Sequence, residues 1–133
     1  MKTYSQDILS HESAIEILQQ AIYEASKYSI AITITKVDPG LKIVAQLSMD
    51  GATPHSIETS RRKAQAAVST KKSTGWMDSS LEISLPMASG NILTNIPGGM
   101  PIKRNGTVVA ALGIAGGTVQ QDADIAKILT NIN

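Results

Sequence analysis

The sequence contains no cysteine and no phenylalanine, and aromatic residues make up only 3% of its 133 residues. Without cysteine the chain can form neither disulfide bonds nor thiolate-ligated metal sites, and it has no thiol nucleophile. Proteins that bind single-stranded nucleic acid stack bases on several aromatic side chains. The few rings of this chain do not supply such a surface, so we predict no nucleic-acid partner.

The sequence also lacks a large net charge and long hydrophobic runs. A formal net charge of +1 gives no overall field that would attract DNA, RNA or an anionic membrane. No run of about 18 apolar residues exists that could cross a membrane, and the first residues lack the apolar core of a secretory signal. We therefore predict a cytoplasmic protein with no membrane partner.

Aliphatic residues must fill the core. Hydrophobic residues make up 42% of the chain, and seventeen of them are isoleucine. A chain of this length is typical of one domain that buries roughly two thirds of its unfolded surface. We predict a single domain, residues 1–133, packed through branched and small side chains.

Apolar periodicity and turn signals predict an α+β fold. Helices are expected over residues 11–27, 55–72 and 81–85, the last limited by Pro86. A fourth helix is expected after the capping box of Thr118 and Gln121, with an apolar stripe of Ile125, Ile128, Leu129 and Ile132. Strands are expected over residues 30–35, 43–49, 92–96, 102–104 and 107–115.

The arrangement of these elements can also be predicted. Asn105-Gly106 is a strong two-residue hairpin signal, and residues 108–115 are apolar on both faces, as in a central strand covered on both sides. In the second helix, Ile57 is expected at the centre of a buried face of small residues, which would let the helix approach its neighbour closely. We predict a three-layer α-β-α domain with a mostly antiparallel sheet of about five strands.

Two glycine-rich segments are candidate ligand sites. In the loop of residues 97–101, Gly98 and Gly99 lie between two prolines, so a ligand could approach the backbone, or the loop is simply a tight turn. Residues 113–118 join a strand to a helix, where an anion could bind; a plain turn is the favoured reading. Lys63, at the edge of the small-residue face, either reaches into a pocket or extends over apolar surface to water.

Histidine and acidic residues offer no complete catalytic site. His11 and His55 each stand at the start of an expected helix, where capping or exposure is the alternative to metal binding. One of them could ligate a haem iron, with Met49, Met87 or Met100 as a second ligand. The aspartates lie in turns and caps, where they are common for structural reasons. We therefore expect a binding protein rather than an enzyme.

Three segments in a fixed order carry a family resemblance. They are residues 37–40, residues 49–52 leading to 62–64, and residues 98–102 leading through 105–106 to 113–117 and Asp122. In this order they resemble the GlcG/HbpS family of haem-binding-like proteins, which also includes the C-terminal domain of PduO-type cobalamin adenosyltransferases. The resemblance spans nearly the whole chain. It implies a profilin-like or GAF-like α-β-α domain and homo-oligomers, with haem or iron bound in some members.

The resemblance also suggests a site. At matching positions it implies a pocket formed by Asp50, Gly51, Lys63, Gly98, Gly99 and Pro101. His55 and His11 are the candidate haem ligands on their residue type, and the resemblance does not add to that. The leading hypothesis is a small oligomeric protein that binds haem or another small anionic ligand there. The alternatives are an accessory or regulatory oligomer of a metabolic operon, and an enzyme acting on a small acid or haem through Lys63 and Asp50.

Overall fold

Four antiparallel strands form the centre of the fold, in the order β2-β1-β4-β3. A computed structural model describes residues 1–131 of the chain. Ile132, which was predicted to belong to the apolar stripe of the last helix, lies outside the described residues. The strands are β1 (Thr33–Val37), β2 (Ile43–Ser48), β3 (Gly99–Arg104) and β4 (Thr107–Ala115). The helices are α1 (His11–Lys27), α2 (Ser56–Thr70), α3 (Ser84–Ala88) and α4 (Val119–Thr130).

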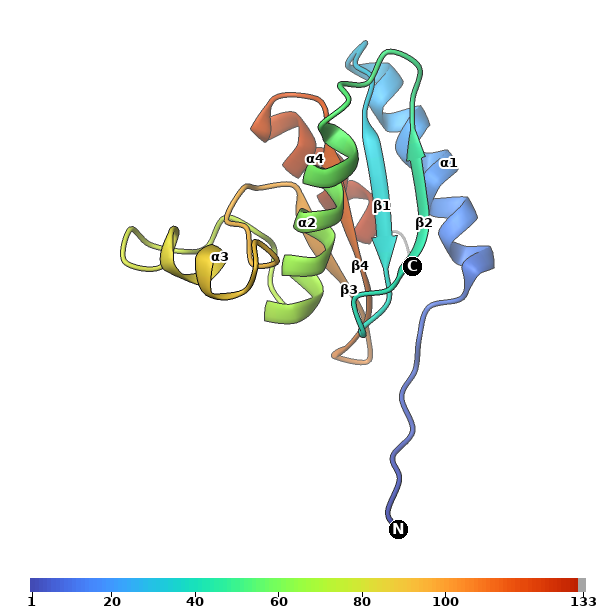
Figure 1. Ribbon diagram of the computed structural model, residues 1–133. Helices are drawn as coiled ribbons and strands as arrows, with labels where there is room; N and C mark the ends of the chain where they lie inside the picture. The colour runs from blue at the N-terminus through green and yellow to red at the C-terminus, as the bar shows by residue number, and fades with distance from the viewer. Residues whose placement is uncertain (132–133) are drawn as a thin grey trace.

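Helices cover both faces of this sheet. α2 packs on one face, against β1, β4 and β3, while α1 and α4 pack on the other and contact each other. Figure 1 shows α2 in front of the strands, with α1 and α4 behind them. The predicted three-layer α-β-α arrangement is therefore confirmed.

The predicted number of strands was wrong, because residues 92–96 do not join the sheet. Their backbone groups make local turns instead: the amide of Leu93 donates to Ser89 Oγ at 3.0 Å and that of Ile92 to the Ser89 carbonyl at 3.3 Å. The edge strand β3 begins at Gly99, three residues earlier than expected. Gly99, Met100 and Pro101 therefore belong to a strand rather than to a loop.

Local signals located most of the other elements. The bounds of α1 and β4 agree with prediction, and the capping box of Thr118 and Gln121 opens α4. The third helix begins later than expected, at Ser84, with Pro86 inside it, because Asp78 caps a separate turn at Ser80. In α2 the small residues are buried, but Ile57 is 47% exposed, so its predicted place at the centre of the buried face was wrong.

Glycines allow α2 to lie directly on the sheet. Gly113 in β4 and Gly99 in β3 are paired across the two strands and face the helix. A Cβ atom on Gly113 would lie 1.9 Å from the Ser60 carbonyl oxygen, and one on Gly99 would lie 2.2 Å from the Lys63 carbonyl oxygen. Both distances are far below van der Waals contact, so backbone touches backbone at these two points.

Hydroxyl groups fill the same interface toward β1. Thr33 Oγ1 is hydrogen-bonded to Ser56 Oγ at 2.6 Å and to Ser48 Oγ at 2.7 Å, and Thr35 Oγ1 to Ser60 Oγ at 2.7 Å. Thr33, Thr35, Ser56 and Ser60 are buried, and their hydroxyls satisfy one another, which removes the cost of burying them unpaired. The helix is therefore fixed in register by polar contacts as well as by close packing.

We expect Gly113→Ala to destabilise the fold strongly, because α2 must move away from β4 to admit the methyl group. The free energy of unfolding, measured by urea denaturation, should fall by about 3 kcal/mol, at the upper end of the range for overpacked cores. Gly40→Ala is the matched control, since a Cβ there meets only Asp38 Oδ1, at 3.4 Å. Equal stabilities of the two variants would contradict direct contact of the helix backbone with Gly113.

Candidate functional site

Lys63 lies inside the molecule, where three segments meet. Its side chain is 2% exposed, and its ammonium group donates to the Ile114 carbonyl at 2.7 Å and to Asp122 Oδ2 at 3.1 Å. The other carboxylate oxygen of Asp122 accepts the Gly117 amide at 2.9 Å. Lys63 thus joins α2 to the end of β4 and to the first turn of α4, and it reaches neither open solvent nor an empty pocket.

The surroundings of Lys63 affect its protonation and leave little space around its amine. Burial lowers the pKa of Lys63 below its ordinary value, while the charge of Asp122 acts in the opposite direction. Gly98, with φ +124°, passes directly over the amine, and a Cβ there would lie 2.9 Å from Lys63 Nζ. The predicted association of Lys63 with Gly98 therefore exists, but as a structural contact.

Gly98 and Gly99 line a cleft of about 240 Å³ against α4. Across the cleft lie side chains of the first half of the helix, among them Gln120 and Asp124. Thr74 closes one side, because its hydroxyl accepts the Gly99 amide at 2.8 Å and its amide donates to the Gly99 carbonyl at 3.0 Å. We call this the glycine cleft.

A larger groove continues from the glycine cleft across the outer edge of β3. It has a volume of about 660 Å³ and shares Ser73, Met100 and Lys127 with the cleft. We call it the lysine groove, and its lining consists of Lys71, Lys72, Ser73, Trp76, Met100, Pro101, Lys103, Lys127, Thr130 and Asn131. Four of these residues are lysines and none is acidic. The ammonium group of Lys72 lies over the Trp76 ring, 4.3 Å from its centroid.

The other predicted site residues lie elsewhere. Asp50 lines a separate shallow pocket with side chains of α1 and β2, and Gly51 forms the neighbouring turn with φ +84°. Because the strands alternate in direction, this turn is at the same end of the sheet as Gly98. Lys63 is buried, however, and does not line the pocket to which Asp50 belongs. His11 and His55 are exposed, and neither lines the lysine groove or the glycine cleft.

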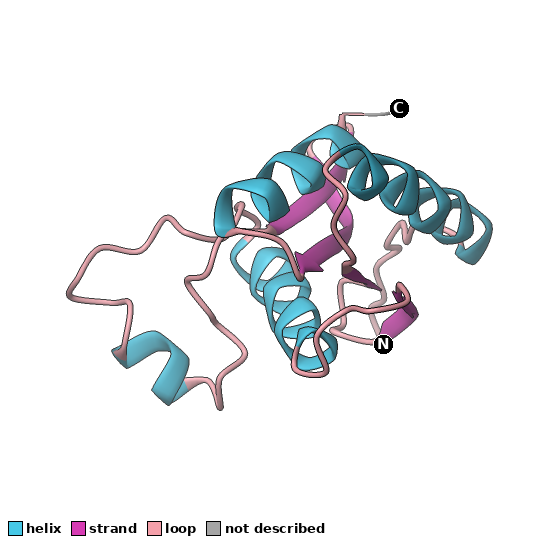
Figure 2. Ribbon diagram, turned by 90° about the horizontal axis from the view of Figure 1, so that it is seen from above, coloured by secondary structure: helices cyan, strands magenta, loops and turns pink. Residues whose placement is uncertain are grey.

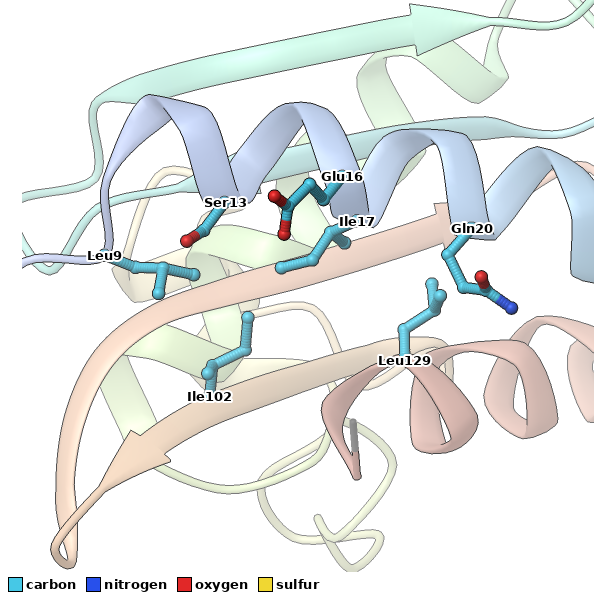
Figure 3. Close-up of a pocket in the computed structure, with 7 residues that line it drawn as sticks. All are labelled: Leu9, Ser13, Glu16, Ile17, Gln20, Ile102 and Leu129. Carbon is cyan, nitrogen blue, oxygen red and sulfur yellow. The ribbon is translucent and has the colours of Figure 1, made fainter. Parts of the chain in front are cut away.

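An apolar pocket of about 490 Å³ lies between α1, α4 and β3. Figure 3 shows its aliphatic walls, Leu9, Ile17, Ile102 and Leu129, and the polar side chains that α1 directs toward it, among them Glu16. The carboxylate of Glu16 is the one charged group in this lining. This pocket therefore suits an apolar ligand and disfavours an anion.

The lysine groove was not predicted from the sequence. Its residues come from the segment after α2, from β3 and from the end of α4. In the sequence, each of its lysines taken alone is typical of an exposed surface charge. The signal that could have indicated it is the pair Lys71-Lys72, two cations close in sequence to Trp76, the one tryptophan of the chain. Within residues 1–131 no three carboxylate or histidine side chains gather as a metal site. None of the helices described there combines the length and the hydrophobicity of a membrane span.

Comparison with known proteins places the chain in a family. The family described as "Haem degrading protein HbpS-like" matches residues 9–129. The chain belongs to this HbpS-like family. It is 30% identical, over 86% of its length and 84% of the relative's, to an uncharacterized 15.0 kDa protein encoded between dhaT and dhaS in Citrobacter freundii. It is 28% identical to the corrinoid adenosyltransferase PduO of the same organism, of which it spans only 37%.

Solved structures share the fold of this HbpS-like domain. The protein ORFY of Klebsiella pneumoniae superposes with a TM-score of 0.93 at 25% identity, covering 98% of this chain and 94% of ORFY. PduOC, solved as a complex with haem, superposes with a TM-score of 0.86 at 25% identity, covering 92% of this chain and 93% of PduOC. The predicted relationship to HbpS and PduO is confirmed.

We expect Asp122→Asn to destabilise this HbpS-like domain by about 3–5 kcal/mol, because it leaves the Lys63 ammonium buried without a counter-charge. Asp124→Asn, two residues along the same helix and more exposed, is the matched control and should change stability little. Urea denaturation of both variants measures the difference. A small effect of Asp122→Asn would show that water reaches Lys63.

The lowered pKa of Lys63 predicts a dependence of stability on pH. Between the folded pKa and the ordinary value of 10.5, the unfolded chain keeps a proton that the folded chain has released, so the free energy of unfolding rises with pH. Lys63→Met should reduce this rise, whereas Lys42→Met, at an exposed position, should not. Denaturation curves from about pH 8 to pH 10.5 measure both slopes. Equal slopes for the wild type and Lys63→Met would contradict the lowered pKa.

Proposed function

We propose that this domain binds a flat anionic ligand, with haem as the candidate, in the lysine groove. The observation that carries the proposal is the convergence of four lysines around Trp76 and Met100, with no carboxylate in the lining. Haem combines a broad apolar face with two carboxylates. A groove that combines apolar walls with several cations complements both parts.

The cations would hold the carboxylates of the ligand. Ammonium groups form charge-assisted hydrogen bonds with carboxylates, and a flexible lysine can follow the position of a propionate. Lys103 on β3 and Lys127 on α4 approach the groove from different elements. Two carboxylates on one ligand could therefore be bound from two sides.

The apolar surface would hold the ring system. The Trp76 ring, with the ammonium of Lys72 4.3 Å from its centroid, places positive charge beside a flat apolar surface. Pro101 and Met100 extend this surface along β3. Since aromatic side chains are so scarce in this protein, most of the wall is aliphatic.

Met100 is the residue of the groove that could face an iron atom. Its thioether is a ligand type that haem iron accepts, and it lines both the lysine groove and the glycine cleft. Bound haem would supply a redox-active iron. His11 and His55 lie outside the groove, so the proposal does not use them as ligands there.

The residues of the predicted pocket have supporting roles in this proposal. Gly98 and Gly99 provide the bare backbone of the adjoining cleft, and Pro101 contributes to the groove itself. Lys63 acts as a positioning residue, because its contacts with Ile114 and Asp122 hold the first turn of α4 beside Gly98. Asp50 and Gly51 have no part in the groove.

The relatives support haem as the candidate. PduOC was solved with haem, and the family description names haem degradation. We propose binding rather than catalysis for this chain, because Asp50 and Lys63, its suggested polar catalytic groups, do not share a pocket. We do not propose the activity of full-length PduO for this chain, because the chain spans only 37% of that protein.

Titration with haemin, followed by the Soret absorption, tests the proposal. We expect saturable binding to the wild type, and about tenfold weaker binding to the double variant Lys103→Gln with Lys127→Gln. The expected loss corresponds to about 0.7 kcal/mol for each exposed ion pair removed. Met100→Leu should shift the Soret band while it preserves the volume of the side chain.

Two controls separate this site from non-specific adsorption. Lys2→Gln with Lys42→Gln removes the same charge from exposed positions outside the groove and should bind like the wild type. The double variant His11→Ala with His55→Ala should keep the Soret band. Equal weakening by both lysine pairs, or loss of the band in the histidine variant, would contradict haem binding in the lysine groove.

A further inference from the structure

The apolar pocket between α1, α4 and β3 is a second concave site of this molecule. Figure 2 shows α1 and α4 side by side on one face of the sheet, where they contact each other. The pocket volume of about 490 Å³ is typical of small-molecule sites, and its lining shares no residue with the lysine groove or the glycine cleft. Ile102 from β3 and Leu129 from α4 point toward α1 in Figure 3. Both side chains belong to the main core, so the pocket opens directly onto it.

The wall at the start of α1 is fixed by backbone contacts. The Leu9 amide donates to the Val109 carbonyl at 3.1 Å, and the Leu9 carbonyl accepts a hydrogen bond from the Lys36 ammonium group at 2.8 Å. Lys36 is 0% exposed and is not part of the lining, so its charge is directed at the Leu9 backbone and does not face the pocket. The pocket is therefore preformed, which spares a ligand the cost of ordering its wall.

One side of the pocket is a row of hydrogen-bond acceptors on α1. Ser13, Glu16 and Gln20 are spaced by three and four residues, which places them along one helix face over about 10 Å. The side-chain amide of Gln20 donates to Glu24 Oε1 at 3.0 Å, so the Gln20 oxygen is left to accept. Figure 3 shows the Glu16 carboxylate between Ser13 and Gln20, on the pocket side of the helix. The negative charge is thus at the middle of the row.

Glu16 differs from the other acidic residue of this part of α1 in having no cation beside it. Glu24 pairs with Lys27 at 3.2 Å, whereas none of the ion pairs within residues 1–131 includes Glu16. The lining of the pocket contains no lysine, arginine or histidine. A ligand in the pocket removes water from this carboxylate, and a carboxylate without water is costly unless a cation replaces it. The ligand must therefore supply a positive charge as well as an apolar body.

We propose that this pocket binds an aliphatic amine, with its ammonium group on Glu16 and its chain against the aliphatic walls. An ammonium group has three donors, and the oxygens of Ser13 and Gln20, one turn away on either side, are in place to accept beside Glu16. A fatty acid of the same length would set its carboxylate against Glu16, and an alcohol would leave the charge of Glu16 unpaired. The lysine groove takes no part in this site, so amine binding does not depend on haem binding.

Isothermal titration calorimetry with three ligands of equal chain length tests the proposal: n-octylamine, n-octanol and octanoate. We expect saturable binding of octylamine, about fivefold tighter than that of octanol, which is the upper end of what a partly exposed ion pair contributes. Octanoate should bind more weakly than octanol. Glu16→Gln should reduce the affinity for octylamine to that for octanol and should raise the affinity for octanoate.

Two further variants locate the site. Glu82→Gln removes the same charge from an exposed position outside the lining, and it should bind all three ligands like the wild type. Ser13→Trp, at a half-buried position of the row, should fill the pocket and abolish binding of all three, while the chain keeps a cooperative thermal unfolding transition and an unchanged haemin titration. No saturable binding of octylamine, equal affinities for octylamine and octanoate, an amine preference that survives in Glu16→Gln, or undiminished binding to Ser13→Trp would overturn the proposal.

Discussion

The α2 backbone lies directly on Gly113 and Gly99, and this contact sets the position of the helix, the buried ion pair and the glycine cleft. It brings the helix against the sheet without intervening side chains, and at that separation the Lys63 side chain reaches the end of β4. Asp122 approaches from α4 and neutralises the ammonium group. A buried ion pair contributes little net stability but is costly to break, so it specifies where the first turn of α4 must lie. The glycine cleft is formed between that turn and Gly98.

The lysine groove is the consequence of this arrangement at the outer edge of the sheet. β3 is the edge strand, and its Gly99 is closed by Thr74 while Pro101 has no amide to offer another strand. A further strand therefore cannot pair along this edge, and the side chains beside it line a groove instead. The segment after α2 and the end of α4 flank it with lysines, so the surface is both apolar and cationic. Charge, rather than size, distinguishes it from the pocket between α1 and α4, where Glu16 stands in the lining.

Predictions from the sequence are correct where the signal lies within a few residues and wrong where the structure depends on distant segments. The capping box at Thr118 and the Asn105-Gly106 turn act within a few residues, and both appear as predicted, with positive φ at Asn105 and Gly106. The strand expected at residues 92–96 has the right composition but no neighbouring strand with free backbone groups. Ile57 fits the helical periodicity yet faces outward, because the close approach at Gly113 rotates the small face of α2 onto the sheet.

The family, the α+β class, the α-β-α layering and the positions of α1, β4 and α4 follow from the sequence, since periodicity and caps are short-range properties of the chain. The buried structural role of Lys63 does not follow from it, because the partners of its ammonium group, Ile114 and Asp122, are remote in sequence and meet it only in the folded chain. Lysines from three separate segments also line one groove only because the fold brings those segments together. Burial and convergence depend on which distant segments meet, and no local pattern of residues encodes that.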